Sequence, residues 1–301
     1  MLIHRSISQR GLAAGGGHAT QMGDRTTYPP PSNRLLDAPS AQELLAEPRV
    51  PFIGGVVMPS DLSTVFQPIV ALEAGEVLAY EALVRCSAHG LSPTNLFERA
   101  AAHKSAGRLG RMVREIAVPL CSGTPLFVNL HPSELEEGWL VRPDDPIFSH
   151  DDDIYLEITE SAPLTHFELC ASVLREVCGR VGVHLVVDDL GAGYSNLKLI
   201  AELQPSVVKL DRNLIQDLDR KPRQQKLVAI VVHLCHDLGA LVVAEGIETN
   251  GEYEAVRDSG AEYGQGYLFA RPSFPIPAIS WPPPPPIDPV PATRPSRRAG
   301  A

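Results

Sequence analysis

Short apolar runs in the middle of this chain repeatedly end in a carboxylate or another polar side chain. The run at 184–187, for example, leads directly into Asp188 and Asp189. The polar residues at such ends are Glu81, Asn129, Glu157, Asp188, Asp189, Lys209 and Glu245. Because an unpaired carboxylate is costly to bury, acids at the ends of buried strands predict a shared cation, with phosphodiester or polyphosphate chemistry around it.

Strand-like runs alternate with helical patterns along the central part of the chain. Strands are expected at 64–70, 77–85, 126–130, 154–159, 184–189, 207–211, 241–246 and 264–269, and helices at 93–103, 108–121, 164–180, 195–203, 213–238 and 249–259. Strands that alternate with helices predict a closed β/α barrel. Only residues 72–76 separate the first two strands, so that pair is expected to be an antiparallel hairpin. The expected fold class is therefore α/β, a modified TIM-type (β/α)8 barrel with the first strand antiparallel.

Composition divides the chain into three zones. Residues 1–60 are rich in Gly, Pro and Ser, which predicts a flexible N-terminal segment. The barrel is expected over 61–275. Residues 276–301 include Pro282 to Pro286 and predict a Pro-rich disordered tail. That tail is either an inert, solvated end or a docking peptide for a protein partner that reads proline-rich segments.

Charge and cysteine content narrow the function classes. The net charge is −10 and the central region has no basic stripe, so binding to duplex nucleic acid is not expected. No apolar run approaches the roughly 20 residues that span a bilayer, and no membrane segment is expected. The five cysteines are scattered without a CxxC spacing, which predicts reduced thiols and a cytoplasmic protein.

Eight ordered motifs resemble the EAL-domain cyclic-di-GMP phosphodiesterase family. They lie at 66–70, 80–85, 128–132, 156–161, 188–195, 208–211, 244–249 and 265–269. The three residues Glu81-Ala82-Leu83 alone would carry little information, but the ordered set of motifs over residues 62–273 is highly specific. The resemblance implies a hydrolase that opens cyclic-di-GMP to linear pGpG with two Mg²⁺ or Mn²⁺ ions, and it implies a homodimer.

The same resemblance implies a role for each polar residue at a strand end. One metal would be held by Glu81, Asn129, Glu157 and Asp188, and a second by Asp188, Asp189 and Glu245. Lys209 would orient the attacking water and is expected to stay protonated among the acids. Lys209, Glu245 and Glu81 are thus the expected catalytic residues. Whether Glu245 accepts the proton, or no separate base is needed, stays open at this point.

Further positions match residues that the family uses around the substrate. Period-two alternation puts Glu81, Leu83 and Arg85 on one strand face, and the fork of an arginine suits phosphate oxygens. The expected substrate-binding residues are Gln67, Leu83, Arg85, Asp211 and Gln265, and the expected loop-supporting residues are Glu160 and Glu248. For Glu160 the alternative is an acid at a helix N-terminus, ahead of Pro163.

Two stretches depart from the family pattern. Leu190 stands where the family usually has Phe, in a loop that links the metal site to the dimer interface. The connection after Arg85, residues 86–93, is shorter than usual. These departures leave open a second hypothesis, a catalytically inactive cyclic-di-GMP receptor that signals through a protein partner. No matched metal position is lost, which favours the enzyme.

Overall fold

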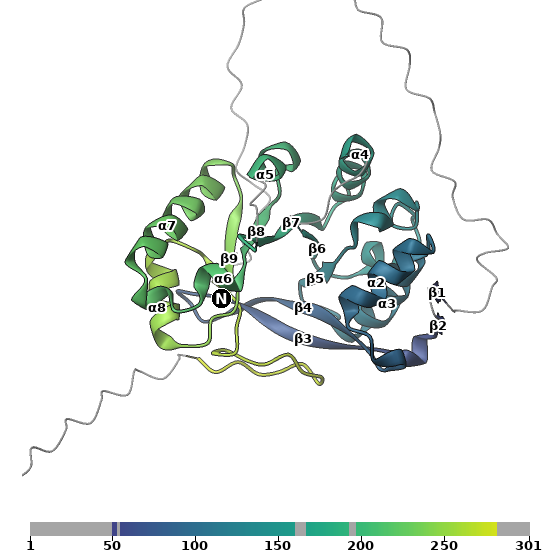
Figure 1. Cartoon of the computed structure of the whole chain (residues 1–301), viewed down its shortest axis with the longest axis horizontal. Helices are drawn as coiled ribbons and strands as arrows, with labels where there is room; N and C mark the ends of the chain where they lie inside the picture. Colours follow the sequence, from purple (N-terminus) through teal and green to yellow (C-terminus); the bar gives the residue numbers. More distant parts are fainter. Residues whose placement is uncertain (1–49, 53–54, 160–166, 193–196, 282–301) are drawn as a thin grey trace, which may run out of the picture. The chain divides into compact units, whose positions relative to one another are not determined.

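Eight strands form a closed barrel in the described part of the chain. The computed structural model describes residues 50–52, 55–159, 167–192 and 197–281. Around the barrel the strands follow the order β10-β3-β4-β5-β6-β7-β8-β9. They are β3 (Leu62–Ala71), β4 (Val77–Cys86), β5 (Leu126–Asn129), β6 (Ile154–Thr159), β7 (Val183–Leu190), β8 (Val207–Leu210), β9 (Leu241–Ala244) and β10 (Tyr263–Gly264). β3 is antiparallel to both neighbours and the remaining pairs are parallel, which confirms the predicted barrel with an antiparallel first strand (Figure 1).

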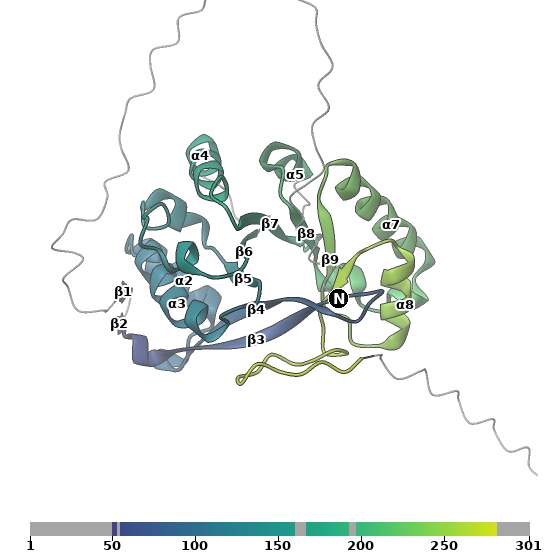
Figure 2. The same ribbon diagram turned by 180° about the vertical axis from the view of Figure 1, so that it is seen from behind.

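Helices follow most of the parallel strands and lie outside the barrel on every side except that of β3, as the two opposite views show (Figures 1 and 2). They are α2 (Pro93–Ala102), α3 (Ala106–Leu120), α4 (Phe167–Cys178), α5 (Leu197–Leu203), α6 (Arg212–Ile215), α7 (Pro222–Asp237) and α8 (Asn250–Asp258). Short 3-10 turns are η1 (Pro59–Asp61), η2 (Ala88–Gly90), η3 (Pro132–Glu136), η4 (Pro146–Ser149) and η5 (Leu218–Arg220). None of the described helices is long and apolar enough to cross a membrane.

The single helix expected over 213–238 is wrong. The structure divides it into α6, η5 and α7, because Asp217 has a positive φ of 55° and Pro222 begins α7. Proline lacks the backbone N–H that a helix interior requires, and it fits best in a first helical turn. The first of these pieces, α6, begins two residues after the end of β8, and its first residue, Arg212, lies at the mouth of the barrel.

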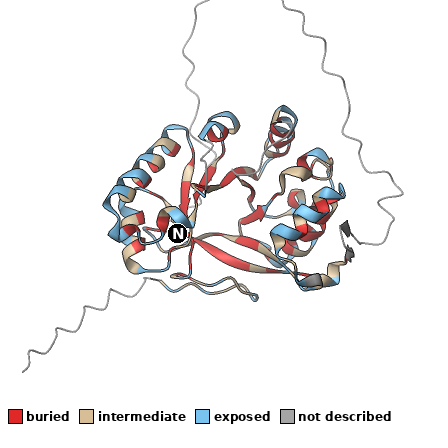
Figure 3. Ribbon diagram, viewed as in Figure 1, coloured by how far each residue is buried: buried red, intermediate tan, exposed pale blue. Residues whose placement is uncertain are grey.

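The core has two apolar layers that follow from the alternation of side chains along each strand. On β6, Leu156 and Ile158 face outward into the large cluster between sheet and helices. Tyr155 faces inward, where its ring stacks on Phe127 with centroids 4.3 Å apart. Buried residues accordingly follow the strands, while the helices are exposed on their outer sides (Figure 3). The inward layer closes one end of the barrel and leaves the other end to polar residues.

A buried ionic cluster fixes the turn that follows β5. Arg114 of α3 donates from Nη1 to Glu134 Oε2 at 2.8 Å and from Nη2 to Asp145 Oδ2 at 2.9 Å. All three side chains are at most 1% exposed. Glu134 also accepts from the backbone N–H of His131 at 3.0 Å. The cluster therefore ties α3 to η3 and η4, next to the strand that carries Asn129.

Packed structure extends beyond both boundaries that composition predicts for the barrel. Residues 50–57, within the expected flexible segment 1–60, form a hairpin of β1 (Val50–Phe52) and β2 (Gly55–Val57). Its last residue, Val57, is buried against Leu62 and Leu96. At the other end Trp281 packs against the core. Val57 and Trp281 therefore bury apolar surface inside segments for which the Gly and Pro content had predicted flexibility. Residues 1–49 and 282–301 lie outside the described part of the chain.

Candidate active site

The site is one polar layer that sits directly above the inward apolar layer. Each buried residue of the inward apolar layer has a polar side chain two positions away on its own strand, on the same face. The pairs are Ala79 and Glu81, Phe127 and Asn129, Tyr155 and Glu157, Val186 and Asp188, Val207 and Lys209, and Val243 and Glu245, with Ile69 and Gln67 in the reverse direction on antiparallel β3. The barrel thus brings these predicted site residues together at the carboxyl ends of the parallel strands.

Lys209 lies at the centre of the acidic residues and is fully buried. Its Nζ is 2.5 Å from Glu245 Oε1, 2.7 Å from Glu157 Oε1, 3.4 Å from Glu81 Oε2 and 3.5 Å from Asp188 Oδ1. Burial alone would lower the pKa of Lys209, but the four carboxylates outweigh burial and hold this pKa well above its ordinary value. The ammonium group is therefore a permanent positive charge and a hydrogen-bond donor.

One ammonium group cannot balance this number of buried acids. Burial is the main cause that raises the pKa of Glu157 well above its ordinary value, the pKa of Asp188 to about 6 and the pKa of Glu245 to about 8. Glu81 differs: although burial opposes ionisation, Lys209 and two amide donors lower its pKa. Without further cations the layer therefore favours the protonated forms of these acids, and cations bound beside them would favour the ionised forms.

The oxygen atoms present suit divalent cations. Carboxylate oxygens of Asp188, Asp189 and Glu245 lie within 4.8 Å of one another. Glu157 Oε2 is buried and receives no hydrogen bond from the described residues. Carboxylates and an amide oxygen are hard ligands of the kind that Mg²⁺ and Mn²⁺ prefer. The side chains therefore fit the metals that the family resemblance implies.

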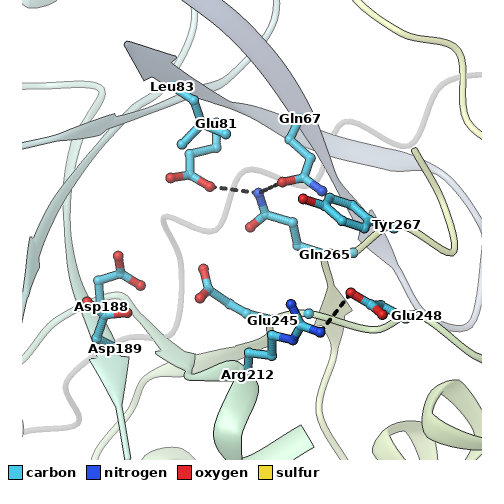
Figure 4. Close-up of a pocket in the computed structure, with 12 residues that line it drawn as sticks. Gln67, Glu81, Leu83, Asp188, Asp189, Arg212, Glu245, Glu248, Gln265 and Tyr267 are labelled. Carbon is cyan, nitrogen blue, oxygen red and sulfur yellow. Dashed lines mark hydrogen bonds and ion pairs between the residues drawn. The ribbon is translucent and has the colours of Figure 1, made fainter. Parts of the chain in front are cut away.

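Two amide side chains donate to the carboxylate of Glu81, and a third contacts one of these two amides. Asn129 Nδ2 donates to Glu81 Oε1 at 3.0 Å, and Gln265 Nε2 donates to Glu81 Oε2 at 2.6 Å. Gln265 Nε2 also lies 3.1 Å from Gln67 Oε1, and Gln67 Nε2 donates to the carbonyl of Ala270 at 3.1 Å. The two glutamines are labelled in Figure 4, where dashed lines mark their contacts. Gln265, which directly follows the last strand of the barrel, thereby helps to orient Glu81, a predicted metal ligand.

An open pocket of about 320 Å³ lies over this layer (Figure 4). Its lining includes the predicted residues Gln67, Glu81, Leu83, Asp188, Asp189, Glu245, Glu248 and Gln265. Arg212, Gly246, Gly266 and Tyr267 line it as well, and sequence reasoning missed them. Their positions in the sequence could have indicated them, because each lies one or two residues from a predicted site residue, in a turn after a strand.

Some predicted residues lie outside the pocket lining. Arg85 is exposed and donates from Nη1 to the carbonyl of Val84 at 2.9 Å. Asp211 Oδ1 accepts from the backbone N–H of Asn213 at 2.9 Å and so caps α6. Their substrate-binding roles stay predictions.

The two residues expected to support loops have different outcomes. Glu248 forms an ion pair with Arg212, with 3.0 Å between Glu248 Oε1 and Arg212 Nη2. Glu160 lies outside the described residues. Leu190, the departure from the family pattern, is 1% exposed and belongs to the large apolar cluster. An aliphatic side chain therefore fills this position without leaving the core.

The fold and the pocket together define a β/α barrel protein with a carboxylate-rich site at the carboxyl ends of its strands. The family model of the EAL domain matches residues 59–272, so the chain belongs to the EAL domain family. Among curated relatives, the cyclic di-GMP phosphodiesterase RocR of Pseudomonas aeruginosa is 29% identical over 257 residues, which are 79% of this chain and 64% of RocR. The cyclic di-GMP phosphodiesterase PA2567 of the same species is 31% identical over 231 residues, which are 72% of this chain and 39% of PA2567. The chain thus spans less than two thirds of either relative.

Solved structures show the same fold. BlrP1 of Klebsiella pneumoniae, determined as a calcium and cyclic-di-GMP complex, superposes with a TM-score of 0.61 at 33% identity, over 72% of this chain and 57% of BlrP1. The EAL domain protein of Listeria monocytogenes superposes with a TM-score of 0.62 at 27% identity, over 71% of this chain and 89% of that protein. A second BlrP1 structure contains manganese with cyclic-di-GMP.

Proposed function

We propose that this chain is a cyclic-di-GMP phosphodiesterase that hydrolyses one phosphodiester bond to give linear pGpG, with two Mg²⁺ or Mn²⁺ ions. The observation that carries the proposal is the intact polar layer, in which four carboxylates surround the buried ammonium group of Lys209. The relatives named as cyclic di-GMP phosphodiesterases support the substrate. The calcium and manganese complexes of BlrP1 support the use of divalent cations.

The proposed ligands are divided between two cations. Glu81, Asn129, Glu157 and Asp188 would hold one, and Asp188, Asp189 and Glu245 would hold the other. When bound, the two cations activate a water molecule and stabilise the charge that develops on the phosphate oxygens.

The protein's own side chains orient the reacting groups and accept a proton. Lys209, kept protonated by the surrounding acids, donates hydrogen bonds to the attacking water or to a phosphate oxygen. Asn129 and Gln265 hold the carboxylate of Glu81 in one orientation. Glu245 is the most exposed carboxylate in contact with Lys209, with a side chain 20% exposed. We assign to Glu245 the role of accepting a proton from the attacking water.

The finer setting of the enzyme belongs to the same proposal. All five cysteines are free thiols, which suits a reducing compartment, and we place the protein in the cytoplasm. Homodimerisation stays a prediction from the family resemblance. A protein partner for the Pro-rich tail is a prediction about residues that lie outside the described part of the chain.

The test is to incubate the purified protein with cyclic-di-GMP and Mg²⁺ or Mn²⁺ and to separate the products by chromatography. Glu81→Ala is the inactive variant, and Glu73→Ala, at an exposed position of the β3–β4 turn, is the matched control. Linear pGpG from the wild type and from Glu73→Ala, but not from Glu81→Ala, supports the proposal. If cyclic-di-GMP stays intact but binds measurably, the phosphodiesterase hypothesis is refuted and the hypothesis of an inactive receptor is supported.

A further inference from the structure

A segment that follows directly on the residues matched by the EAL family model packs against strand β3. This C-terminal strap, residues 273–281, runs beside β3 in both views (Figures 1 and 2). Phe66 of β3 donates its backbone N–H to the carbonyl of Ser273 at 2.9 Å, and Ser273 donates its own N–H to the carbonyl of Phe66 at 3.0 Å. β4 covers one edge of β3, and β10 pairs with the other edge at Val70 and Ala71. The strap therefore occupies a further part of the edge that β10 shares.

The last residue of the strap, Trp281, anchors its far end. The ring centroid of Trp281 lies 5.5 Å from that of Tyr253 and 6.0 Å from that of Phe269. The backbone N–H of Ser280 donates to the carbonyl of Phe269 at 3.0 Å. A Cβ atom at Gly75, in the turn between β3 and β4, would overlap the indole ring. The indole is therefore held closely between that turn and Phe269.

One hydrogen bond connects this packing with the candidate active site. Ala270 lies in the sequence between Phe269, which contacts Trp281, and Ser273, which bridges to β3. The strap therefore holds Ala270 from both sides. The carbonyl of Ala270 accepts a hydrogen bond from Gln67 Nε2 at 3.1 Å. The strap thus determines where the side-chain amide of Gln67 lies.

The carbonyl of Ala270 also fixes which way round the Gln67 amide lies. With Nε2 on that carbonyl, Gln67 Oε1 faces Gln265 Nε2 at 3.1 Å. A flipped amide would place two oxygens together at Ala270 and two nitrogens together at Gln265. Gln265 Nε2 carries two N–H groups, one for Gln67 and one for Glu81 Oε2 at 2.6 Å. Because Gln265 Oε1 receives no hydrogen bond from the described residues, the orientation of this amide toward Glu81 depends on Gln67.

We propose that the C-terminal strap, anchored by Trp281, is a positioning element that orients the carboxylate of Glu81 through Gln67 and Gln265. The kinetic consequence rests on the proposed function, whereas the hydrogen bonds themselves do not require a ligand. Trp281 is absent from the described pocket lining and acts through other residues. Pairing of β3 with β4 does not involve the strap, so we expect the barrel to stay closed when the strap is released.

The kinetic test compares Trp281→Ala with Trp139→Ala in the full-length protein, with cyclic-di-GMP and Mn²⁺. We expect Trp281→Ala to lower kcat about tenfold, which corresponds to one misplaced hydrogen bond to a charged group. Trp139 is the other tryptophan of the chain, and its ring lies 5.5 Å from the guanidinium group of Arg142 in the segment after β5. Trp139→Ala removes a half-buried indole outside the strap and should keep the wild-type kcat. Rates are measured well below the melting temperature of each variant.

A double-mutant cycle separates positioning from simple stabilisation of the fold. Gln67→Met removes the hydrogen bonds of this amide and keeps the length of the side chain. If the strap acts through Gln67, Trp281→Ala should have no further effect on kcat in the Gln67→Met background, whereas independent effects would multiply. Multiplied effects, or a lower melting temperature with an unchanged kcat, would refute the proposal. If Trp281→Ala does not fold, Trp281→Leu retains part of the apolar contact and enters the same cycle.

The side-chain amide signal of Gln265 in NMR spectra supplies a readout that needs neither metal nor activity. This signal, identified by its loss in Gln265→Ala, should shift in Trp281→Ala and keep its position in Trp139→Ala. A shifted signal in a protein that forms no pGpG would refute the phosphodiesterase and support the strap. Formation of pGpG by the wild type, with a Gln265 signal that Trp281→Ala leaves unshifted, would refute the strap alone.

Discussion

Replacement of Glu134 by Gln should make the pH dependence of unfolding visibly flatter. Glu134 is fully buried beside Arg114 and Asp145. Burial raises the pKa of Glu134 from 4.5 to about 7, although Arg114 opposes that shift. An acid whose pKa is raised by folding binds its proton more tightly in the native state, so it favours folding at low pH. That contribution is lost as the pH rises from about 4.5 to about 7.

The magnitude follows from the size of the shift. A change from 4.5 to about 7, at about 1.4 kcal/mol for each pH unit, amounts to about 3 kcal/mol over the whole window. Between pH 5.0 and 7.5 the part of this that falls inside the range is about 2 kcal/mol. Gln resembles the protonated form of Glu134, because each has a single carbonyl oxygen to accept from Arg114 or the backbone of His131. Any difference between Gln and protonated Glu is the same at both pH values and cancels in the comparison.

The assay is urea unfolding at pH 5.0 and 7.5, followed by the fluorescence of Trp139 and Trp281. Relative to the wild type, Glu134→Gln should gain about 2 kcal/mol in its free energy of unfolding on going from pH 5.0 to 7.5. Glu136→Gln, at an exposed position of the same turn, should show no such gain. A relative stability of Glu134→Gln that falls with rising pH would mean that the ion pair with Arg114 outweighs burial, and it would refute the reasoning.

Three further predictions concern the site. Glu157→Gln should lose most of the increase in melting temperature that Mn²⁺ gives the wild type, because a buried ligand becomes neutral; Glu73→Gln should keep that increase, as a thermal-shift assay would show. Gly266→Ala should destabilise the protein by about 2 kcal/mol or more, since its Cβ would collide with a backbone carbonyl; urea unfolding measures this, and an unchanged midpoint contradicts it. Gln265→Ala should lower kcat/KM for cyclic-di-GMP about tenfold, because it removes the 2.6 Å hydrogen bond to Glu81; steady-state kinetics with unaltered values would exclude that positioning role.

The barrel could be predicted from the sequence because its information is local. Period-two alternation and the short connection at 72–76 belong to neighbouring residues, so the antiparallel hairpin of β3 and β4 was readable directly. The bounds of the last strand could not be predicted in this way. The pattern predicted a strand over 264–269, but β10 ends at Gly264, because Gly266 lets the chain turn closely against Ile247. That approach depends on a segment from another part of the chain.

The candidate site likewise has features that the sequence predicts and features that it does not. The sequence placed acids at strand ends, and the resemblance gave them roles, but no pattern indicated that Arg212 and Glu248 form a pair. They meet because Arg212 follows β8, Glu248 follows β9, and these two strands pair in parallel. The buried cluster around Arg114 was equally hidden, since its partners are 20 and 31 positions away.

The sequence by itself determined which residues face the barrel interior, since alternation of side chains is a property of each strand alone. Only the tertiary structure decided that Lys209 would contact four carboxylates and that Tyr267 would face the same pocket as Arg212. The physical reason is that closing the barrel fixes the register between strands. Distances across its mouth therefore depend on all the strands together and on none of them separately.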